Sequence, residues 1–299
     1  MSEGIKINHL QQMLKEYIEN SNESQSAVAK SIGISAPALS QYLKGTYPTP
    51  HKIEPKVEAF LSVSEKRSIA PKKPDFRETS ISTSVMDVIT YCHVQGGIGA
   101  VYGDAGVGKT QGAKAYVSSH PDSIFITIAP AYSTPKGVSE LIAEELRINE
   151  ASSIRRMYRD IVKKLAKSGR VIIIDEAQHL TLRALEHLRA ISDESGVGLV
   201  LIGNDEIYTK MLGRGEAAFA QLFSRMAIRE NVLTTKVKLN DVKLLFPELN
   251  EDEQKFLWRI ARSRWGIRGA VNVFVNSASN QDVSVDGLTN VAKYMGIGA

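Results

Sequence analysis

Hydrophobic positions follow two different patterns along this chain of 299 residues. Up to about residue 61 they recur at helical spacing, and no β-branched run interrupts them. From about residue 84 to residue 234, short β-branched runs alternate with longer amphipathic segments. This alternation is typical of a parallel sheet whose strands are joined by crossover helices. The runs predict strands over residues 98–102, 124–128, 171–175, 199–203 and 226–231.

These patterns divide the chain into four segments. Residues 1–61 are expected to form a small all-α domain, and residues 62–82 are polar and proline-bearing, which is typical of a linker. Residues 83–234 are expected to form an α/β domain, and residues 235–299 a C-terminal helical domain. The clearest helix of that last segment is predicted over 250–265, with an asparagine N-cap and an acidic first turn.

The composition is that of an ordinary water-soluble protein, with 43% hydrophobic residues, 23% charged residues and a formal net charge of +4. This basic excess permits an anionic partner without requiring one. No apolar run approaches the ~18 residues of a membrane span, and the N-terminus lacks the pattern of a signal peptide. The single cysteine, Cys92, excludes an internal disulfide and is expected to be buried. We therefore expect a cytoplasmic protein with no membrane partner.

A phosphate-binding motif, G-x-x-x-x-G-K-[ST], directly follows the first predicted strand. Its glycines let backbone N–H groups close around phosphate oxygens, and the helix that follows directs its positive end at them. Lys109 is expected to reach the terminal phosphates, and the hydroxyl of Thr110 to bind Mg²⁺. The alternative is a chance glycine-rich turn between a strand and a helix. The motif comprises Gly103, Asp104, Ala105, Gly106, Val107, Gly108, Lys109 and Thr110.

Two later strands end in polar residues that suit the same site. The fully apolar strand over 171–175 ends in Asp175 and Glu176, which fits the middle of a parallel sheet. Asp175 is expected to help hold Mg²⁺, and Glu176 to orient the attacking water. Asn204 follows the next strand and is expected to contact the γ-phosphate or the water, unless it only forms a turn. No Asn-Lys-x-Asp sequence for guanine follows a late strand, so ATP is favoured over GTP.

From about residue 84 to its end, the order of these motifs resembles the AAA+ ATPase superfamily. The resemblance implies a P-loop α/β domain with a C-terminal helical lid, and it places the first sensor at Asn204. It also implies that Arg225 is an arginine finger for a neighbouring subunit, so that hydrolysis requires an oligomer. An intramolecular salt bridge is the alternative role for Arg225. Arg268 falls in the second-sensor segment, but it precedes Asn272 by four residues where the family pattern has three, which leaves that role open.

Residues 25–45 resemble the helix-turn-helix of phage repressors. Gly33 is expected to form the turn and Ser35 to cap the second helix, and a protein-binding helical hairpin is the alternative. The second helix carries few Arg and Asn side chains, which favours weak or sequence-tolerant DNA binding. The residues expected to face inward are Val28, Ile34, Leu39 and Leu43. The residues expected to face the major groove are Ser35, Ala36, Ser40, Gln41 and Lys44.

A strongly basic amphipathic helix is predicted over residues 154–167. Its cations suit a DNA phosphate backbone, although such a run is equally typical of a solvated helix face. The predicted buried stripe comprises Ile154, Tyr158, Ile161, Val162 and Leu165. The cations are Arg155, Arg156, Arg159, Lys163, Lys164 and Lys167.

The whole arrangement, from repressor-like unit to ATPase, resembles the Mu B-like transposition proteins of bacteriophages. Residues 175–180, 202–204 and 219–225 occur in matching order. The resemblance implies an ATP- and Mg²⁺-dependent ATPase that binds double-stranded DNA largely without sequence preference. It also implies a homo-oligomer, as a ring or helical filament, that delivers target DNA to a transposase. The alternatives are an ATP-controlled, sequence-specific transcription regulator and a secretion or assembly AAA+ ATPase.

Overall fold

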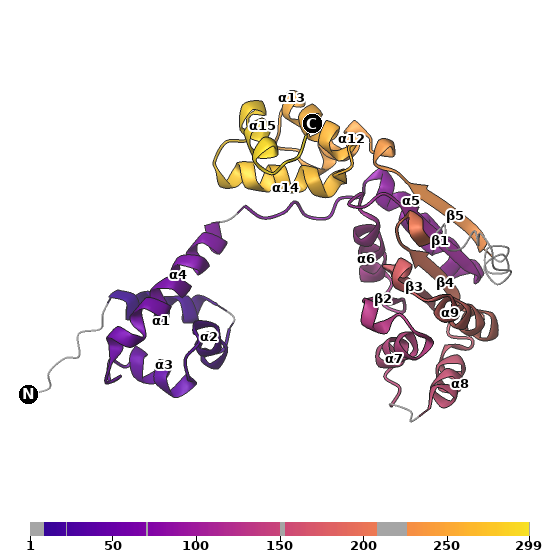
Figure 1. Cartoon of the computed structure of the whole chain (residues 1–299), viewed down its shortest axis with the longest axis horizontal. Helices are drawn as coiled ribbons and strands as arrows, with labels where there is room; N and C mark the ends of the chain where they lie inside the picture. The colour runs from indigo at the N-terminus through magenta and orange to yellow at the C-terminus, as the bar shows by residue number, and fades with distance from the viewer. Residues whose placement is uncertain (1–8, 22, 70, 150–152, 208–225, 299) are drawn as a thin grey trace, which may run out of the picture. The chain divides into compact units, whose positions relative to one another are not determined.

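The computed structural model describes residues 9–21, 23–69, 71–149, 153–207 and 226–298. The chain divides into two compact units, Met1–Pro71 and Lys72–Ala299, and each unit has its own hydrophobic core. Figure 1 shows the smaller unit as a cluster of helices and the larger unit as a sheet with helices and a C-terminal helical part.

The first unit is all helical. Its elements are α1 (His9–Asn20), α2 (Gln25–Ile32), α3 (Ala36–Leu43), the 3₁₀ turn η1 (Pro50–Lys52) and α4 (Glu54–Ile69). Gly33 ends α2 at φ 75°, a left-handed conformation that favours glycine, and Ser35 then caps α3 by accepting from the backbone N of Ala38 at 3.3 Å. The sharp turn between two short helices is therefore built as the sequence predicted. The fully buried core side chains include Leu14, Val28, Leu39, Tyr42 and Val57.

The irregular segment between the units is shorter than the predicted linker of residues 62–82. Helix α4 continues to Ile69, because residues 62–69 contain no glycine or proline that would end it, and the next proline is Pro71. On the other side, Thr79 and Ser82 form a capping box that starts helix α5 at Ser80. The prolines of the segment lie between these two helix ends.

The five described strands of the second unit form one parallel sheet in the order β2-β3-β4-β1-β5. All five strands predicted from the sequence are confirmed to within one residue at each end. Their bounds are β1 Ile98–Gly103, β2 Ile124–Thr127, β3 Val171–Asp175, β4 Gly198–Ile202 and β5 Met226–Val232.

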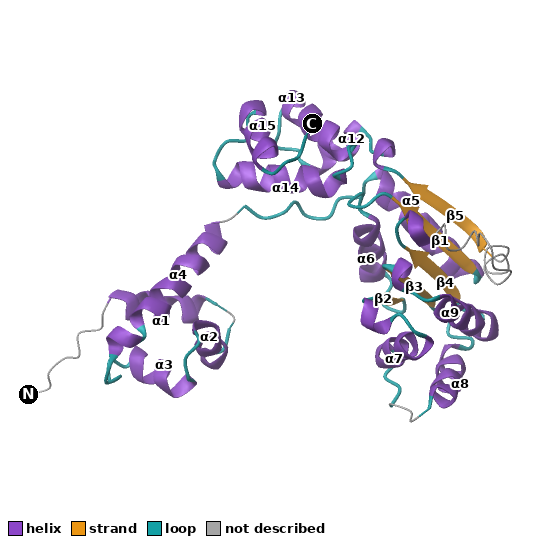
Figure 2. Ribbon diagram, in the orientation of Figure 1, coloured by secondary structure: helices purple, strands orange, loops and turns teal. Residues whose placement is uncertain are grey.

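Helices cover both faces of this sheet (Figure 2). Alternate residues of β3 enter different cores: Ile173 packs on the side of α5 and α6, whereas Ile172 and Ile174 pack on the side of α7 to α9. The bounds are α5 Ser80–Gln95, α6 Lys109–Ser119, η2 Pro130–Tyr132, α7 Pro135–Glu145, α8 Ile154–Leu165, η3 Ala177–His179 and α9 Leu182–Ser195.

The C-terminal helices, which we call the lid, share a core with α5, α6 and the sheet. The helix predicted over residues 250–265 begins as expected after Asn250, whose side chain caps it, but it ends at Ala261. The chain then turns and enters the next helix at Gly266, where φ is 63°. The lid comprises η4 Thr234–Lys236, α12 Leu239–Leu245, α13 Glu251–Ala261, α14 Gly266–Ser279 and α15 Val285–Tyr294.

Cys92 is fully buried on α5, as expected, and burial raises the pKa of its thiol to about 12. Gly99 of β1 makes room for it, since a Cβ atom there would lie 2.6 Å from the sulfur. In the described part of the chain, no helix combines the length and apolar composition needed to cross a bilayer.

Candidate functional site

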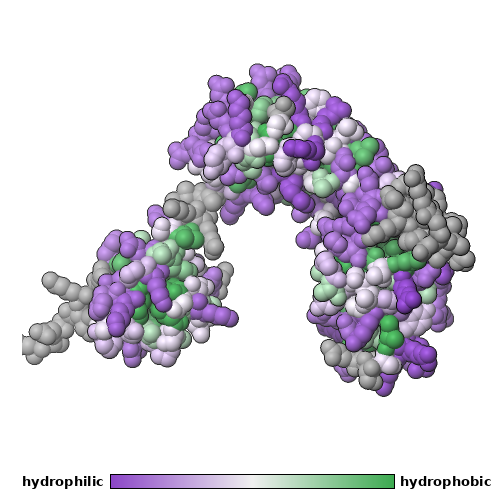
Figure 3. All heavy atoms as spheres, in the orientation of Figure 1, coloured by the Kyte–Doolittle hydropathy of each residue, from purple (hydrophilic) through white to green (hydrophobic). Residues whose placement is uncertain are grey.

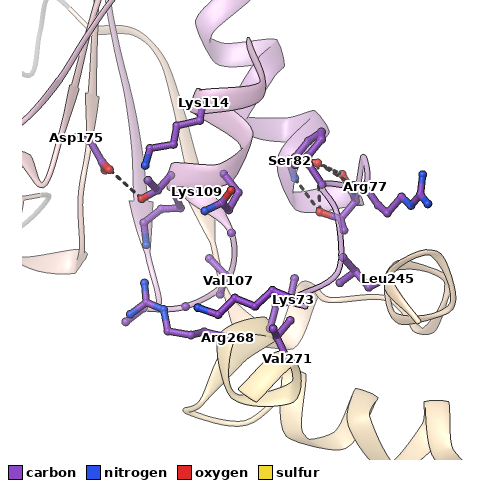
Figure 4. Close-up of a pocket in the computed structure, with 18 of the residues that line it drawn as sticks. Lys73, Arg77, Ser82, Val107, Lys109, Lys114, Asp175, Leu245, Arg268 and Val271 are labelled. Carbon is purple, nitrogen blue, oxygen red and sulfur yellow. Dashed lines mark hydrogen bonds between the residues drawn. The ribbon is translucent and has the colours of Figure 1, made fainter. Parts of the chain in front are cut away.

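The candidate site lies where β1, β3 and β4 end. These strands are neighbours in the parallel sheet, so the P-loop after β1, Asp175 at the end of β3 and Asn204 after β4 emerge at one edge. They line a cavity of about 750 Å³ (Figure 4). The structure thus brings together the P-loop, the acidic strand end and Asn204, which sequence reasoning had assigned to one site.

Glycine is required at two P-loop positions for different reasons. At Gly103, φ is 127° and a Cβ atom would lie 2.2 Å from the carbonyl oxygen of Val232, so a side chain would separate the loop from β5. Gly108 is the N-cap of α6 at φ 109°. Helix α6 therefore begins beside the cavity and directs its positive end at it, which suits a phosphate group.

Lys109 extends along the P-loop. Its Nζ donates to the carbonyl oxygens of Gly103 at 2.9 Å and Asp104 at 2.7 Å. Burial lowers the pKa of Lys109, while the nearby carboxylates, Asp175 first among them, oppose this shift. A partly desolvated ammonium group beside the loop is suited to an anion, because its charge is screened less than on an open surface.

Thr110 and Asp175 meet at the start of α6. The Thr110 hydroxyl donates to Oδ2 of Asp175 at 2.8 Å, and the backbone N of Glu176 donates to Oδ1 at 3.0 Å. Burial raises the pKa of Asp175, and these two hydrogen bonds oppose the shift. A hydroxyl and a carboxylate beside a phosphate loop are oxygen donors that Mg²⁺ uses together with phosphates. The described residues contain no cluster of three His, Cys, Asp or Glu side chains that would bind a metal without phosphate.

Glu176 lies next to this pair in an unusual backbone conformation, with φ 56°. The Nε2 of Gln178 donates to Oε2 of Glu176. The Oε1 of Gln178 accepts from the backbone N of Asn204 at 3.4 Å. Oδ1 of Asn204 in turn accepts from the backbone N of Glu206 at 2.9 Å. Gln178 was missed by sequence reasoning, although it stands two residues after Glu176 and that proximity was the available signal.

Asp104 belongs to the motif, but its carboxylate turns to the start of the lid. Oδ2 accepts from the backbone N of Thr234 at 2.7 Å and from its hydroxyl at 2.9 Å. The Asp104 carboxylate is therefore engaged away from the cavity, and Asp104 is not among the residues that line it. The side chain instead ties the P-loop to the segment between β5 and α12.

The lid also touches the P-loop through α14. The backbone N of Arg268 donates to the carbonyl oxygen of Gly106 at 3.0 Å, and a Cβ atom at Gly266 would lie 2.8 Å from Gly106. Arg268 lines the cavity, and Figure 4 shows its side chain beside the P-loop. Its location therefore suits the expected contact with a nucleotide, whatever its spacing from Asn272.

The part of the cavity wall formed by the segment before α5 was not predicted from the sequence. Residues 73–77, which were assigned to the linker, line the cavity together with lid residues. Lys73 lies on the P-loop side in Figure 4, whereas Arg77 points away from it. No motif marks this segment, because its role depends on folding back against residues far away in sequence. Besides Arg268, the lid residues that line the cavity are Leu245, Ile267, Val271 and Asn272.

Most of the helix-turn-helix residues expected to contact DNA are accessible to solvent. Of the five expected contacts, Ser35, Gln41 and Lys44 are exposed, and Ala36 and Ser40 are half-buried. Among the residues expected to face inward, Val28 and Leu39 are buried, and Ile34 and Leu43 are partly buried against the core. Tyr42 was not foreseen there, yet it is fully buried.

Most cations of helix α8 face solvent, whereas the Nζ of Lys164 donates to the carbonyl oxygen of Leu146. The predicted buried stripe needs correction: Ile154 is 36% exposed, Met157 is buried in its place, and Tyr158 is only half-buried. Ile154 lies in the first turn, beyond the reach of the core, whereas Met157 lies one turn further along the same face. Figure 3 shows strongly hydrophilic side chains over this helix.

Helix α8 ends at Leu165, two residues before its predicted end, so Lys167 lies in the turn that follows. The exposed cations of the helix are Arg155, Arg156, Arg159, Lys163 and Lys164.

Arg225, the expected arginine finger, and the segment before it lie outside the described residues. A family described as an AAA domain matches residues 92–211.

Three curated relatives match most of the chain. It is 32% identical over 267 residues to the Mu-like prophage FluMu DNA transposition protein B of Haemophilus influenzae, covering 85% of this chain and 91% of the relative. It is 28% identical over 270 residues to the ATP-dependent target DNA activator B of Escherichia phage Mu, covering 88% and 86%. The protein of the same name from Escherichia phage D108 matches with the same identity and coverage. The chain therefore belongs to the family of Mu-type DNA transposition proteins B.

Proposed function

We propose that this chain is an ATP-dependent, DNA-binding ATPase that delivers target DNA to a transposase. The observation that carries the ATPase activity is the convergence of the P-loop, Asp175, Glu176 and Asn204 at adjacent strand ends. Membership of the Mu-type family, whose phage relatives are named target DNA activators, supports the role in transposition.

Each group at the site has one role in this proposal. Lys109 and the start of α6 would bind the phosphates, and Thr110 and Asp175 would hold Mg²⁺, which would supply charge neutralisation for phosphoryl transfer. Glu176 orients the attacking water, and Asn204 contacts the γ-phosphate or that water. Arg268 binds from the lid. The base would lie between segment 73–77 and the lid residues Leu245, Ile267 and Val271.

Assembly on DNA is the second part of the proposal. Arg225 completes the site of a neighbouring protomer, so nucleotide binding and oligomerisation are coupled. The exposed cations of α8 contact the phosphate backbone, which gives binding with little sequence preference. The exposed face of α3 adds a weak contact in the major groove. The protein acts in the cytoplasm of the bacterial host, where ATP and target DNA are both present.

Retention of DNA fragments on a filter tests the proposal directly. Duplexes of random sequence and increasing length are incubated with the full chain, with ATP, with ADP or without nucleotide. The proposal predicts retention that requires ATP and increases with duplex length. Protection of one discrete sequence would instead support a transcription regulator, and absence of ATP-dependent retention would support an ATPase that acts on protein partners.

A further inference from the structure

Gln178 joins the two strand ends that carry Glu176 and Asn204. Gln178 lies in the 3₁₀ turn η3 and is only 8% exposed. Its Nε2 donates to the carboxylate of Glu176, while its Oε1 accepts from the backbone N of Asn204 at 3.4 Å. One buried amide thus contacts the group that we assign to the attacking water and the strand end that carries the assigned sensor.

The chemistry of the neighbours fixes which way this amide points. An ionised carboxylate only accepts hydrogen bonds, and a backbone N–H only donates. The opposite orientation of Gln178 would place its oxygen against the Glu176 carboxylate and its NH₂ group against the N–H of Asn204. Both contacts would then be repulsive, so the two neighbours select one orientation.

The surrounding backbone accommodates this contact at some cost. A Cβ atom at Gly203 would lie 2.7 Å from Oε1 of Gln178, so the glycine at the end of β4 leaves space for the amide. Glu176 adopts φ 56°, which is unfavourable for a residue with a side chain. Its backbone is held there by hydrogen bonds from Glu176 N to Asp175 Oδ1 at 3.0 Å and from His179 N to Glu176 O at 3.1 Å.

We propose that Gln178 is a positioning residue for ATP hydrolysis. Its amide holds the Glu176 carboxylate at a fixed position relative to the end of β4, where Asn204 follows. Glu176 and Asn204 then act together on one water molecule and one phosphate group. This inference rests on the proposed ATPase activity of the site. Gln178 acts through Glu176, so its loss lowers the rate of hydrolysis and leaves nucleotide affinity unchanged.

Two substitutions in the full-length chain test whether the hydrogen bonds of the Gln178 amide are needed for hydrolysis. Gln178→Leu has a similar size and removes both hydrogen-bonding groups. Gln178→Glu keeps an acceptor for Asn204 but replaces the donor with a second carboxylate, which repels Glu176. The control is His179→Ala, because His179 lies on the same turn with its side chain exposed.

We expect both Gln178 variants to lower kcat roughly 10- to 100-fold, the loss typical of a slightly misplaced catalytic group. Their affinity for a fluorescent ATP analogue should match that of the wild type, and His179→Ala should match it in both measurements. A kcat equal to that of the wild type would overturn the inference. Loss of nucleotide affinity in both variants would also overturn it, because Gln178 would then only support the fold.

A double-mutant cycle provides the readout that a structural role would not move. If Gln178 acts through Glu176, Gln178→Leu should cause no further loss in single-turnover rate when Glu176→Gln is already present. An equal loss in both backgrounds would contradict the inference. A wild-type protein that does not hydrolyse ATP would refute the proposed activity itself, whereas an active wild type matched by Gln178→Leu refutes only the role of Gln178.

Discussion

The nucleotide site and the proposed DNA-binding surfaces of this chain are built in opposite ways. In the site, neighbouring groups fix each charge: Lys109 bonds to two P-loop carbonyls, and Asp175 is 3% exposed and bonds to Thr110. On α8 most cations face solvent, and the Arg156–Asp160 ion pair has an N···O distance of 3.9 Å with an Arg156 side chain that is 70% exposed. An exposed pair of this kind contributes little.

This difference predicts how each region fails. A site of few fixed groups loses its function when one group is removed, since the others cannot move to replace it. A charged surface acts through the sum of many weak interactions with phosphate groups, so single substitutions matter little and salt concentration matters greatly. The following predictions test this contrast, beginning with the largest expected effect.

Lys109→Ala should abolish nucleotide binding and, with it, ATP-dependent DNA retention. The expected loss is about 2–5 kcal/mol of binding free energy, since the substitution removes a partly buried charge that faces phosphate. Titration with a fluorescent ATP analogue measures it. Lys136→Ala, which removes a cation that is 71% exposed on α7, is the matched control. Retention of DNA by Lys109→Ala at the wild-type level would uncouple the two regions.

Glu176→Gln should still bind ATP but hydrolyse it about 10²- to 10³-fold more slowly, as expected when a group that activates water is lost. Its complexes with DNA should last longer in the presence of ATP, because hydrolysis no longer releases them. Phosphate release and DNA dissociation rates measure the two effects. Wild-type turnover in this variant would assign water activation to another group.

Combined replacement of Arg155, Arg156 and Lys163 by Ala should weaken DNA binding and reduce its salt dependence. The slope of log K against log salt should fall by roughly one for each DNA phosphate that the variant no longer neutralises. The control is a variant in which three exposed cations elsewhere are replaced by Ala, namely Lys136, Lys243 and Lys293. Its net charge equals that of the α8 triple variant. An identical change in both variants would show that only net charge matters and that α8 is a solvated face.

Thr234→Val should have the smallest effect. It removes the hydroxyl that donates to Asp104 but keeps the backbone hydrogen bond, so we expect about 1 kcal/mol less unfolding free energy. Urea denaturation measures this loss. Thr289→Val removes a hydroxyl that donates to Val285 within its own helix and is the control. Reduced nucleotide affinity without reduced stability would mean that Asp104 acts on the ligand rather than on the loop.

Sequence was a good guide where a short segment determines its own structure. The apolar run at 171–175 is a strand with the same bounds in the structure, and the P-loop glycines adopt the conformations that the motif requires. Asn250 caps its helix as predicted. These features depend on neighbours in the chain, so pattern and composition are sufficient to find them.

The sequence was a poor guide where distant segments meet. Asp104 and Thr234 are 130 residues apart, and nothing local shows that a P-loop carboxylate turns to the lid. The role of residues 73–77 in the cavity arises in the same way. On α8, helical spacing alone does not distinguish Ile154 from Met157, because the burial of each depends on how far the neighbouring helices extend.

Sedimentation of the full-length chain with duplexes of increasing length tests the central claim most directly, namely that ATP binding at the P-loop assembles the form that holds DNA. With ATP, we predict complexes whose mass increases with duplex length, and with ADP or with Lys109→Ala we predict none. A protein that sediments as the same species with and without ATP, and that binds DNA equally in both conditions, would contradict the account.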